Sequence, residues 1–207
     1  LWGGKMNYKM YRNLDLFIFF LLMTFSSVVS LFVFSNKSFQ FYFSFNVLVL
    51  FITLVRWNYL GMIPYLISQI ILSVIQIYVF HTEEVLTLIV NLGSLLFLFI
   101  IPLILSKYKK EVRKNPLLLI SLLILTYVLI GIGEAFCLLC LGDFNFIGNF
   151  VFYIFNREIY SIVISLVLII LLRTIDNLIV NVLNHLKINQ EEVDEEWKVS
   201  ENDKTPN

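Results

Sequence analysis

Long runs of apolar side chains follow one another at short intervals along this chain, and they limit the folds open to it. A run of about 20 apolar residues crosses the hydrocarbon core of a bilayer. Lipid offers no hydrogen-bond partner to a backbone amide, so such a segment must be helical. Six segments meet this condition, at residues 15–34, 39–55, 59–80, 85–105, 116–138 and 158–175, the last with a polar extension toward 184.

Composition agrees with a membrane protein. Charged residues make up 14% of the chain and hydrophobic residues 59%, whereas a soluble domain carries roughly 25% charged residues. The zero net charge gives no indication of nucleic-acid binding. We therefore expect an all-α membrane protein, with residues 1–14 as an N-terminal segment, 15–184 as a six-helix domain and 185–207 as an acidic, disordered tail. Residues 1–5 precede Met6 and are set aside as an upstream extension or a cloning remnant.

Basic residues predict the orientation of these spans, because cytoplasmic loops collect Lys and Arg. The segment "SKYKKEVRKN" at 106–115 holds five of the fifteen Lys and Arg residues. Assigning the connections alternately to the two sides puts eleven basic residues on one side and two, Lys37 and Arg157, on the other. Both termini are thus expected in the cytoplasm of a cell-membrane protein, with 106–115 as a cytoplasmic loop. That loop is a topological anchor or a docking contact for a cytoplasmic protein.

The opposite, outer side is acidic. Five acids and two bases are expected there, which favours a cationic or amine-bearing ligand; the same excess also follows from the topology rule alone. The acids are Glu83, Glu84, Glu134, Asp143 and Glu158, the bases are Lys37 and Arg157, and His81 lies on the same side.

Glu134 is the ionisable side chain that stands out within an expected span. Such groups are costly in lipid and mark functional sites by default, although a position near the interface lowers the cost. Cys137 and Cys140 follow as C-x-x-C, a spacing that suits thiol redox chemistry, the binding of a soft metal or simple packing. Quinone-coupled thiol oxidoreductases need a second cysteine pair, which this sequence lacks. It also lacks a P-loop, so we expect no ATP hydrolysis in this chain.

The first expected span carries Ser26, Ser27 and Ser30, a small-residue surface on which another helix can approach closely. The neighbour is either a helix of the same chain or another subunit. A very short turn at 56–58 then joins the second and third spans, and Gly61 and Pro64 interrupt the start of the third.

Together these features resemble the substrate-binding (S) subunits of energy-coupling factor (ECF) vitamin transporters. The resemblance covers most of residues 15–189 and rests on six spans, the small face of the first helix, "VRWNYLGMIPYLISQ", "IVNLGSLLFLFIIP", the basic loop and a long outer connection. It implies capture of a small vitamin-like molecule from outside, with a membrane coupling subunit and two cytoplasmic ATPases as partners. The family's Ala-x-x-x-Ala partner contact would map onto Ser26 and Ser30, where this chain departs from it by using serines.

The resemblance also implies a ligand cavity in the outer halves of the later helices and in the outer loops. Aromatic side chains there would stack a flat heterocycle, while Glu134 or Glu84 would pair with an amine. No cofactor is expected in this chain, and the histidines of the nickel and cobalt members are absent, so a metal substrate is not expected. The candidate binding residues are His81, Glu84, Asn91, Tyr127, Glu134, Asn145, Asn149, Arg157 and Tyr160.

Three other functions stay open: a self-sufficient transporter or channel, a quinone-coupled thiol oxidoreductase using the cysteine pair, and an assembly factor without a ligand. A nearly charge-free midplane and the lack of a convincing internal repeat count against ion-coupled transport.

Overall fold

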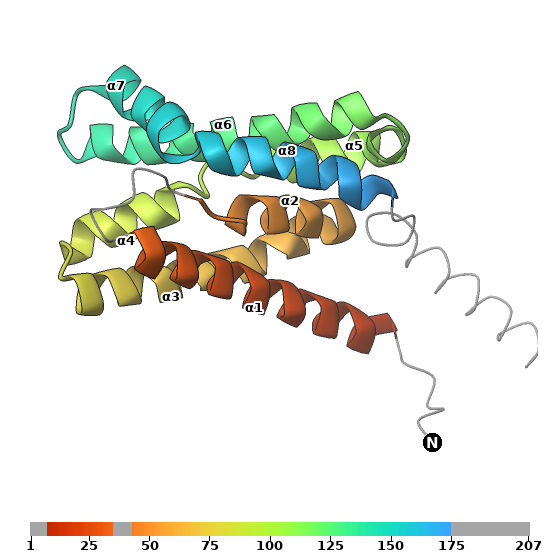
Figure 1. Cartoon of the computed structure of the whole chain (residues 1–207), viewed down its shortest axis with the longest axis horizontal. Coiled ribbons are helices and arrows are strands. Elements are labelled where there is room, and N and C mark those ends of the chain that lie inside the picture. Colours follow the sequence, from red (N-terminus) through yellow and green to blue (C-terminus); the bar gives the residue numbers. More distant parts are fainter. Residues whose placement is uncertain (1–7, 35–42, 175–207) are drawn as a thin grey trace, which may run out of the picture.

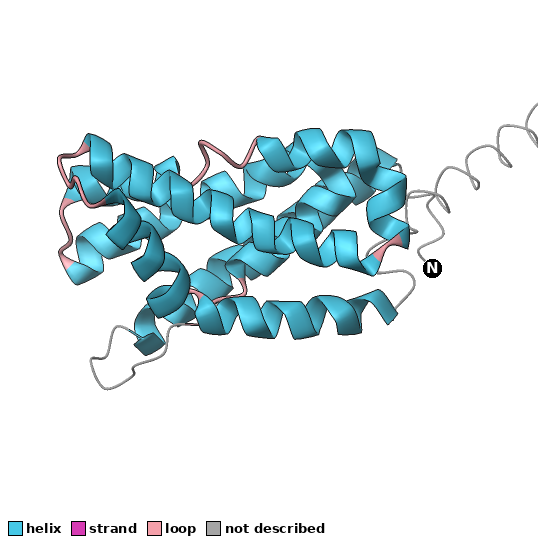
Figure 2. Cartoon of the chain, turned by 90° about the horizontal axis from the view of Figure 1, so that it is seen from above, coloured by secondary structure: helices cyan, strands magenta, loops and turns pink. Residues whose placement is uncertain are grey.

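The computed structural model describes residues 8–34 and 43–174, and every regular element in these ranges is helical (Figures 1 and 2). The all-α expectation is confirmed for this part of the chain. The elements are α1 (Tyr8–Phe34), α2 (Asn46–Trp57), the 3₁₀-helix η1 (Asn58–Gly61), α3 (Met62–Phe80), α4 (Glu84–Gly93), α5 (Ile100–Lys114), α6 (Pro116–Cys140), α7 (Phe146–Val151), the π-helix η2 (Phe152–Arg157) and α8 (Ile159–Thr174).

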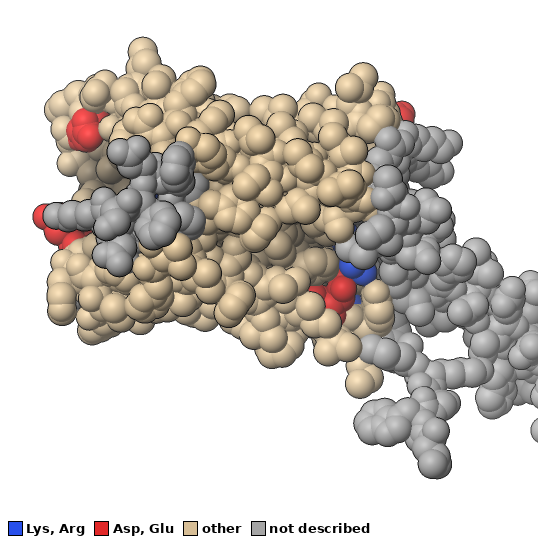
Figure 3. Space-filling view, viewed as in Figure 1, with Lys and Arg blue, Asp and Glu red and all other residues tan. Residues whose placement is uncertain are grey.

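Three helical segments of the described chain are long and apolar enough to cross a membrane, at Lys9–Val33, Asn46–Phe80 and Pro116–Cys140. A fourth arises if Phe146–Arg157 and Ile159–Leu172, which meet at 56°, count as one bent span. Figure 3 shows apolar or uncharged atoms over the middle of the visible face and charged atoms only toward its two ends. This pattern suits a protein surrounded by lipid. The six-span count and the orientation stay predictions.

The second apolar segment folds back on itself between α2 and α3. Asn58 has a positive φ of 54°, and a Cβ added to Gly61 would lie 2.7 Å from the carbonyl carbon of Thr53. Such closeness between residues eight apart is impossible in a continuous helix, which rises 1.5 Å per residue. Gly61 therefore allows η1 to lie directly on the backbone of α2, at the turn that the sequence placed at 56–58.

The expected fourth span, 85–105, is not one regular helix. α4 ends at Gly93, and the next bonds join residues three apart, such as Leu98 N to Leu95 O (3.1 Å) and Ile101 N to Leu98 O (3.1 Å). Pro102 supplies a physical reason, because proline donates no backbone hydrogen bond and its ring crowds the carbonyl four residues earlier. The break puts the polar face of α4 and the basic part of α5 on separately oriented helices.

The N-terminal end of α1, the α2–η1 turn, the α5–α6 connection and the last turn of α8 lie at one end of the molecule (Figure 1). Arg56 there pairs with Asp15 across α1 and α2, with Nη2 3.3 Å from Oδ1, and donates to the hydroxyl of Tyr11 at 3.0 Å. The α3–α4 and α6–α7 connections lie at the opposite end. α6 runs between these ends and packs against α4, α5, α7 and α8 around the fully buried Leu123 and Tyr127.

Candidate functional site

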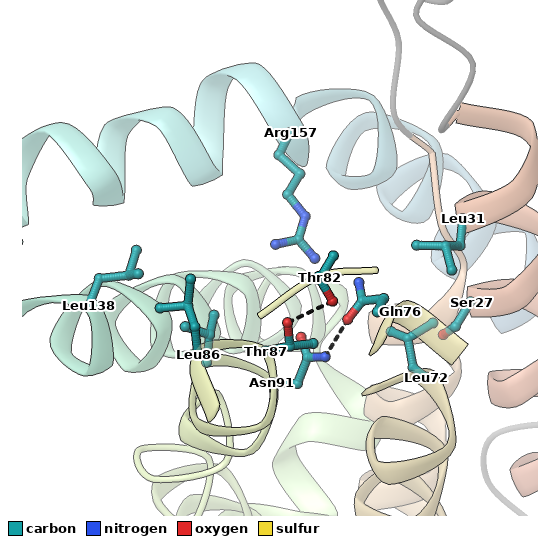
Figure 4. A pocket seen from close by; sticks show the side chains of 11 residues that line it. Ser27, Leu31, Leu72, Gln76, Thr82, Leu86, Thr87, Asn91, Leu138 and Arg157 are labelled. Carbon is teal, nitrogen blue, oxygen red and sulfur yellow. Dashed lines mark hydrogen bonds between the residues drawn. The ribbon is translucent and has the colours of Figure 1, made fainter. Parts of the chain in front are cut away.

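A cavity of about 330 Å³ lies near the end of the molecule that carries the α3–α4 connection. Its described lining comes from α1, α3, α4, α6 and η2 and is part apolar, part polar (Figure 4). The lining residues are Ser27, Leu31, Leu72, Gln76, Thr82, Leu86, Thr87, Val90, Asn91, Leu138 and Arg157. None of these is aromatic, which departs from the stacking surface that the resemblance implied.

A relay of hydrogen bonds orients the two carboxamides of the cavity. Ser73 donates from Oγ to the Gln69 carbonyl at 2.8 Å, so its oxygen accepts from Asn91 Nδ2 at 2.9 Å. The same Asn91 Nδ2 also donates to Gln76 Oε1 at 2.7 Å (Figure 4). The nitrogen of a side-chain amide carries two hydrogens, and Asn91 donates one to Ser73 and the other to Gln76. These bonds define which end of each amide is the nitrogen and which is the oxygen.

Hydroxyl groups complete the polar lining. Thr87 Oγ1 lies 2.9 Å from Thr82 Oγ1 and donates to it, which ties the first turns of α4 to the end of α3. Ser27 reaches the cavity from α1, is 2% exposed, and its Oγ is buried without a hydrogen-bond partner. A buried polar atom without a partner costs free energy, so the Ser27 hydroxyl is a local cost to the stability of this wall of the cavity.

Arg157 carries the positive charge of the lining and is held by two carboxylates. Its Nη1 lies 2.9 Å from Glu134 Oε2 on α6, and its Nε lies 3.4 Å from Glu158 Oε1. The guanidinium also lies over the ring of Tyr153, 5.4 Å from its centroid. The π-helix η2 widens the turn before α8, a distortion that is frequent at functional sites, and here Arg157 ends it.

α4 and α6 approach closely beside the cavity because both contribute glycine. A Cβ on Gly133 would lie 2.6 Å from the carbonyl oxygen of Gly93, and a Cβ on Gly93 would lie 1.9 Å from Cys137 Sγ. Cys137 is buried and thus packs where α4 crosses α6, while Cys140 is exposed; both are free thiols. The contact joins the C-terminal end of α4 to the C-terminal half of α6.

Of the residues that the sequence nominated, Asn91 and Arg157 line the cavity. Glu134 joins them through its ion pair with Arg157. The expected pairing of Glu134 with a ligand amine would have to displace a guanidinium that the carboxylate already holds.

The remaining candidates are not brought together in this lining. Tyr127 is fully buried and shares a hydrogen bond of 2.9 Å with Ser165 Oγ, joining α6 to α8. His81 ends α3 with a positive φ of 52° and an exposed side chain, and Tyr160 is 42% exposed. Glu84 begins α4, but its side chain lies outside the described part of the chain.

Asn145 and Asn149 belong to the start of α7. Asn145 Oδ1 accepts from Gly148 N at 3.1 Å, and Asn149 Nδ2 donates to Asp143 Oδ2 at 2.9 Å. Together with the backbone amide of Asn145, the Asn149 amide holds the pKa of Asp143 below its ordinary value. These asparagines therefore shape the loop between α6 and α7.

Sequence reasoning missed Gln76, Thr82 and Thr87. A signal was present, because Gln69, Ser73 and Gln76 recur at spacings of four and three within the otherwise apolar α3. Such spacing puts polar groups on one face of a helix, and polar side chains in apolar helices face protein or water.

The serine face of α1 packs inside the chain. Ser27 and Ser30 are 2% and 4% exposed, and Ser30 donates to the carbonyl groups of Ser26 and Phe43. Ser26 Oγ accepts from Phe45 N at 2.8 Å. The neighbour of this serine face is therefore a segment of the same chain. The opposite face of α1 exposes large apolar side chains, such as Phe25 at 70%.

Comparison with protein-family models, with curated proteins and with solved structures finds no match to the chain.

Proposed function

We propose that this chain is a membrane-embedded capture subunit, which binds a small vitamin-like molecule in the cavity between α1, α3, α4 and η2. The observation that carries this proposal is the relay-oriented carboxamide pair at the wall of a cavity of about 330 Å³. Ligand sites are typically clefts of roughly 300–1,000 Å³ with mostly apolar walls and a few placed polar groups.

The position of the cavity supports uptake from outside. It lies at the end of the bundle opposite Arg56 and the basic part of α5, and basic segments mark the cytoplasmic side. A ligand would therefore enter from the outer surface, between α7–η2 and the tips of α3 and α4.

Delivery into the cell requires partners in this proposal. The sequence holds no P-loop, so the energy for release would come from a membrane coupling subunit with two cytoplasmic ATPases, as in the ECF importers that the sequence resembles. The apolar outer face of α1 and the basic end of α5 are the surfaces left for such partners and for lipid.

The test is to purify the tagged chain gently from its own membranes into lipid nanodiscs and to identify the accompanying proteins and small molecules by mass spectrometry. We expect a retained small molecule, a membrane subunit and two P-loop ATPases. Asn91→Leu should lose the small molecule and keep the protein partners, whereas Ser121→Ala, on the exposed side of α6, should keep both. An empty chain purified alone would overturn the proposal.

A further inference from the structure

The two carboxamides of the cavity offer a ligand one donor and one acceptor. Asn91 Nδ2 donates its two hydrogens to Ser73 Oγ and Gln76 Oε1, so these atoms already have partners within the chain. Among the interactions of the described residues, none engages Asn91 Oδ1 or Gln76 Nε2, and neither is a buried atom without a partner. Asn91 Oδ1 is therefore open as an acceptor and Gln76 Nε2 as a donor.

The open donor and the open acceptor belong to two lining side chains that are joined by a hydrogen bond of 2.7 Å. Together they complement a ligand that presents one acceptor and one donor N–H, such as a primary amide or a lactam. The relay from the Gln69 carbonyl through Ser73 fixes this polarity, because Ser73 uses its hydrogen on Gln69 and can only accept from Asn91. Preorganised groups lose less freedom when they bind.

The charges at the cavity disfavour ionised ligands. Arg157 is the charged residue of the described lining, and it is already paired with Glu134 and Glu158 at 2.9 and 3.4 Å. A cationic ligand would meet the guanidinium, and an anionic one would have to replace a carboxylate that would then stay buried, since Glu158 is 3% exposed. Leaving one charge uncompensated in such a place is strongly unfavourable.

From these observations we propose that Gln76 and Asn91 form a two-point site, with one donor and one acceptor, for the amide group of an uncharged ligand. This assignment rests on the proposed function in one respect, namely that the cavity is the ligand site. It replaces the amine that the acidic outer residues suggested with a neutral amide or lactam.

The test compares three probes on the same ring: a neutral amide, an anionic acid and a cationic amine. Nicotinamide, nicotinate and 3-(aminomethyl)pyridine, and the matching quinoline set to fill more of the cavity, are titrated into the purified chain in nanodiscs by calorimetry. We expect both carboxamides to bind at least tenfold more tightly than the acid and the amine on the same ring.

Gln76→Glu keeps the size of the side chain and an oxygen for Asn91, but it replaces the donor Nε2 with an acceptor. This variant should weaken carboxamide binding at least tenfold while thermal unfolding stays close to that of the parent chain. Asn149→Leu removes an amide that does not line the cavity and should leave the affinity unchanged.

Preference for the acid or the amine would overturn the assignment, and so would no binding of any of the six probes. An unchanged carboxamide affinity in Gln76→Glu would do so as well. The proposed function is judged separately by the co-purified molecule, so a charged co-purified vitamin would refute the ligand class and leave the capture function standing.

Discussion

Arg157 links η2 to α6 through one side chain. It closes the π-helix η2, pairs with Glu134 of α6 and with Glu158, and lines the cavity. Its side chain is 34% exposed, whereas those of Glu134 and Glu158 are 12% and 4% exposed. Losing the pair therefore costs the buried carboxylates more than it costs the arginine, because water can still solvate the guanidinium.

A double-mutant cycle at Glu134 and Arg157 tests this dependence. We expect Arg157→Gln to destabilise the fold by about 2 kcal/mol, a value below the range for fully buried pairs because the guanidinium is partly exposed. Glu134→Gln should cost less, since Glu158 still pairs with Arg157.

Unfolding in nanodiscs of the two single variants and the double variant measures the coupling. The double variant should be more stable than the sum of the single losses predicts by about 1 kcal/mol or more. Strict additivity would mean that the ion pair contributes nothing to folding.

At the scale of elements, glycines set the distances between helices. Gly61 lets η1 lie on α2, and Gly93 and Gly133 let α4 and α6 touch at their backbones. Because Asn91 and Thr87 of α4 and Leu138 of α6 line the cavity, the second of these contacts also holds two parts of the cavity wall together.

Gly133→Ala should push α4 away from α6, because its Cβ would lie 2.6 Å from the Gly93 carbonyl oxygen. We expect a loss of about 2 kcal/mol in unfolding free energy, typical of overpacking, and weaker ligand binding. Thermal unfolding and titration measure both effects, with Ser121→Ala on the exposed side of α6 as the control. A variant as stable as the control would show that the crossing has room to relax.

The start of α7 should respond to acid. The pKa of Asp143 lies below its ordinary value because its carboxylate accepts from Asn149 and from the backbone of Asn145. Because the pKa of Asp143 is lower in the folded chain, this stabilisation is complete above about pH 4, the pKa of Asp143 in the unfolded chain. It is lost as the pH falls through the pKa of Asp143 in the folded chain.

Hydrogen exchange at Gly148 and Asn149 measures that loss. Their amides should be protected equally at pH 5 and above, after correction for intrinsic exchange, and less protected near pH 3. Asp143→Asn should remove most of the pH dependence. Persistence of the dependence in this variant would assign it to another group.

At the scale of the whole molecule, the face seen in Figure 3 carries its charged residues toward the two ends and other residues over the middle. Arg56 and α5 with its basic residues lie at one end, and Cys140 lies at the other, where α6 ends. The excess of basic residues predicts that the first end faces the cytoplasm.

A membrane-impermeant maleimide applied to intact cells tests that orientation. We expect it to label the exposed Cys140 from outside, and Cys140→Ser to abolish the labelling because Cys137 is buried. A cysteine introduced at Ser106, with Cys140 replaced, should react only after the cells are opened. The reverse pattern would invert the predicted topology.

The sequence alone determined the class of this protein, because apolar runs without polar partners for the backbone leave helices as the solution in lipid. It also located the α2–α3 turn and singled out Asn91, Glu134 and Arg157, since polar groups in apolar surroundings are conspicuous. Only the tertiary structure decided what these groups touch. Glu134 meets Arg157 of a segment 23 residues away, and Gln76 meets Asn91 across two helices. The partner of a polar group depends on how helices cross, and those crossings rest on side-chain packing and glycine contacts between distant segments, which periodicity along one chain does not encode.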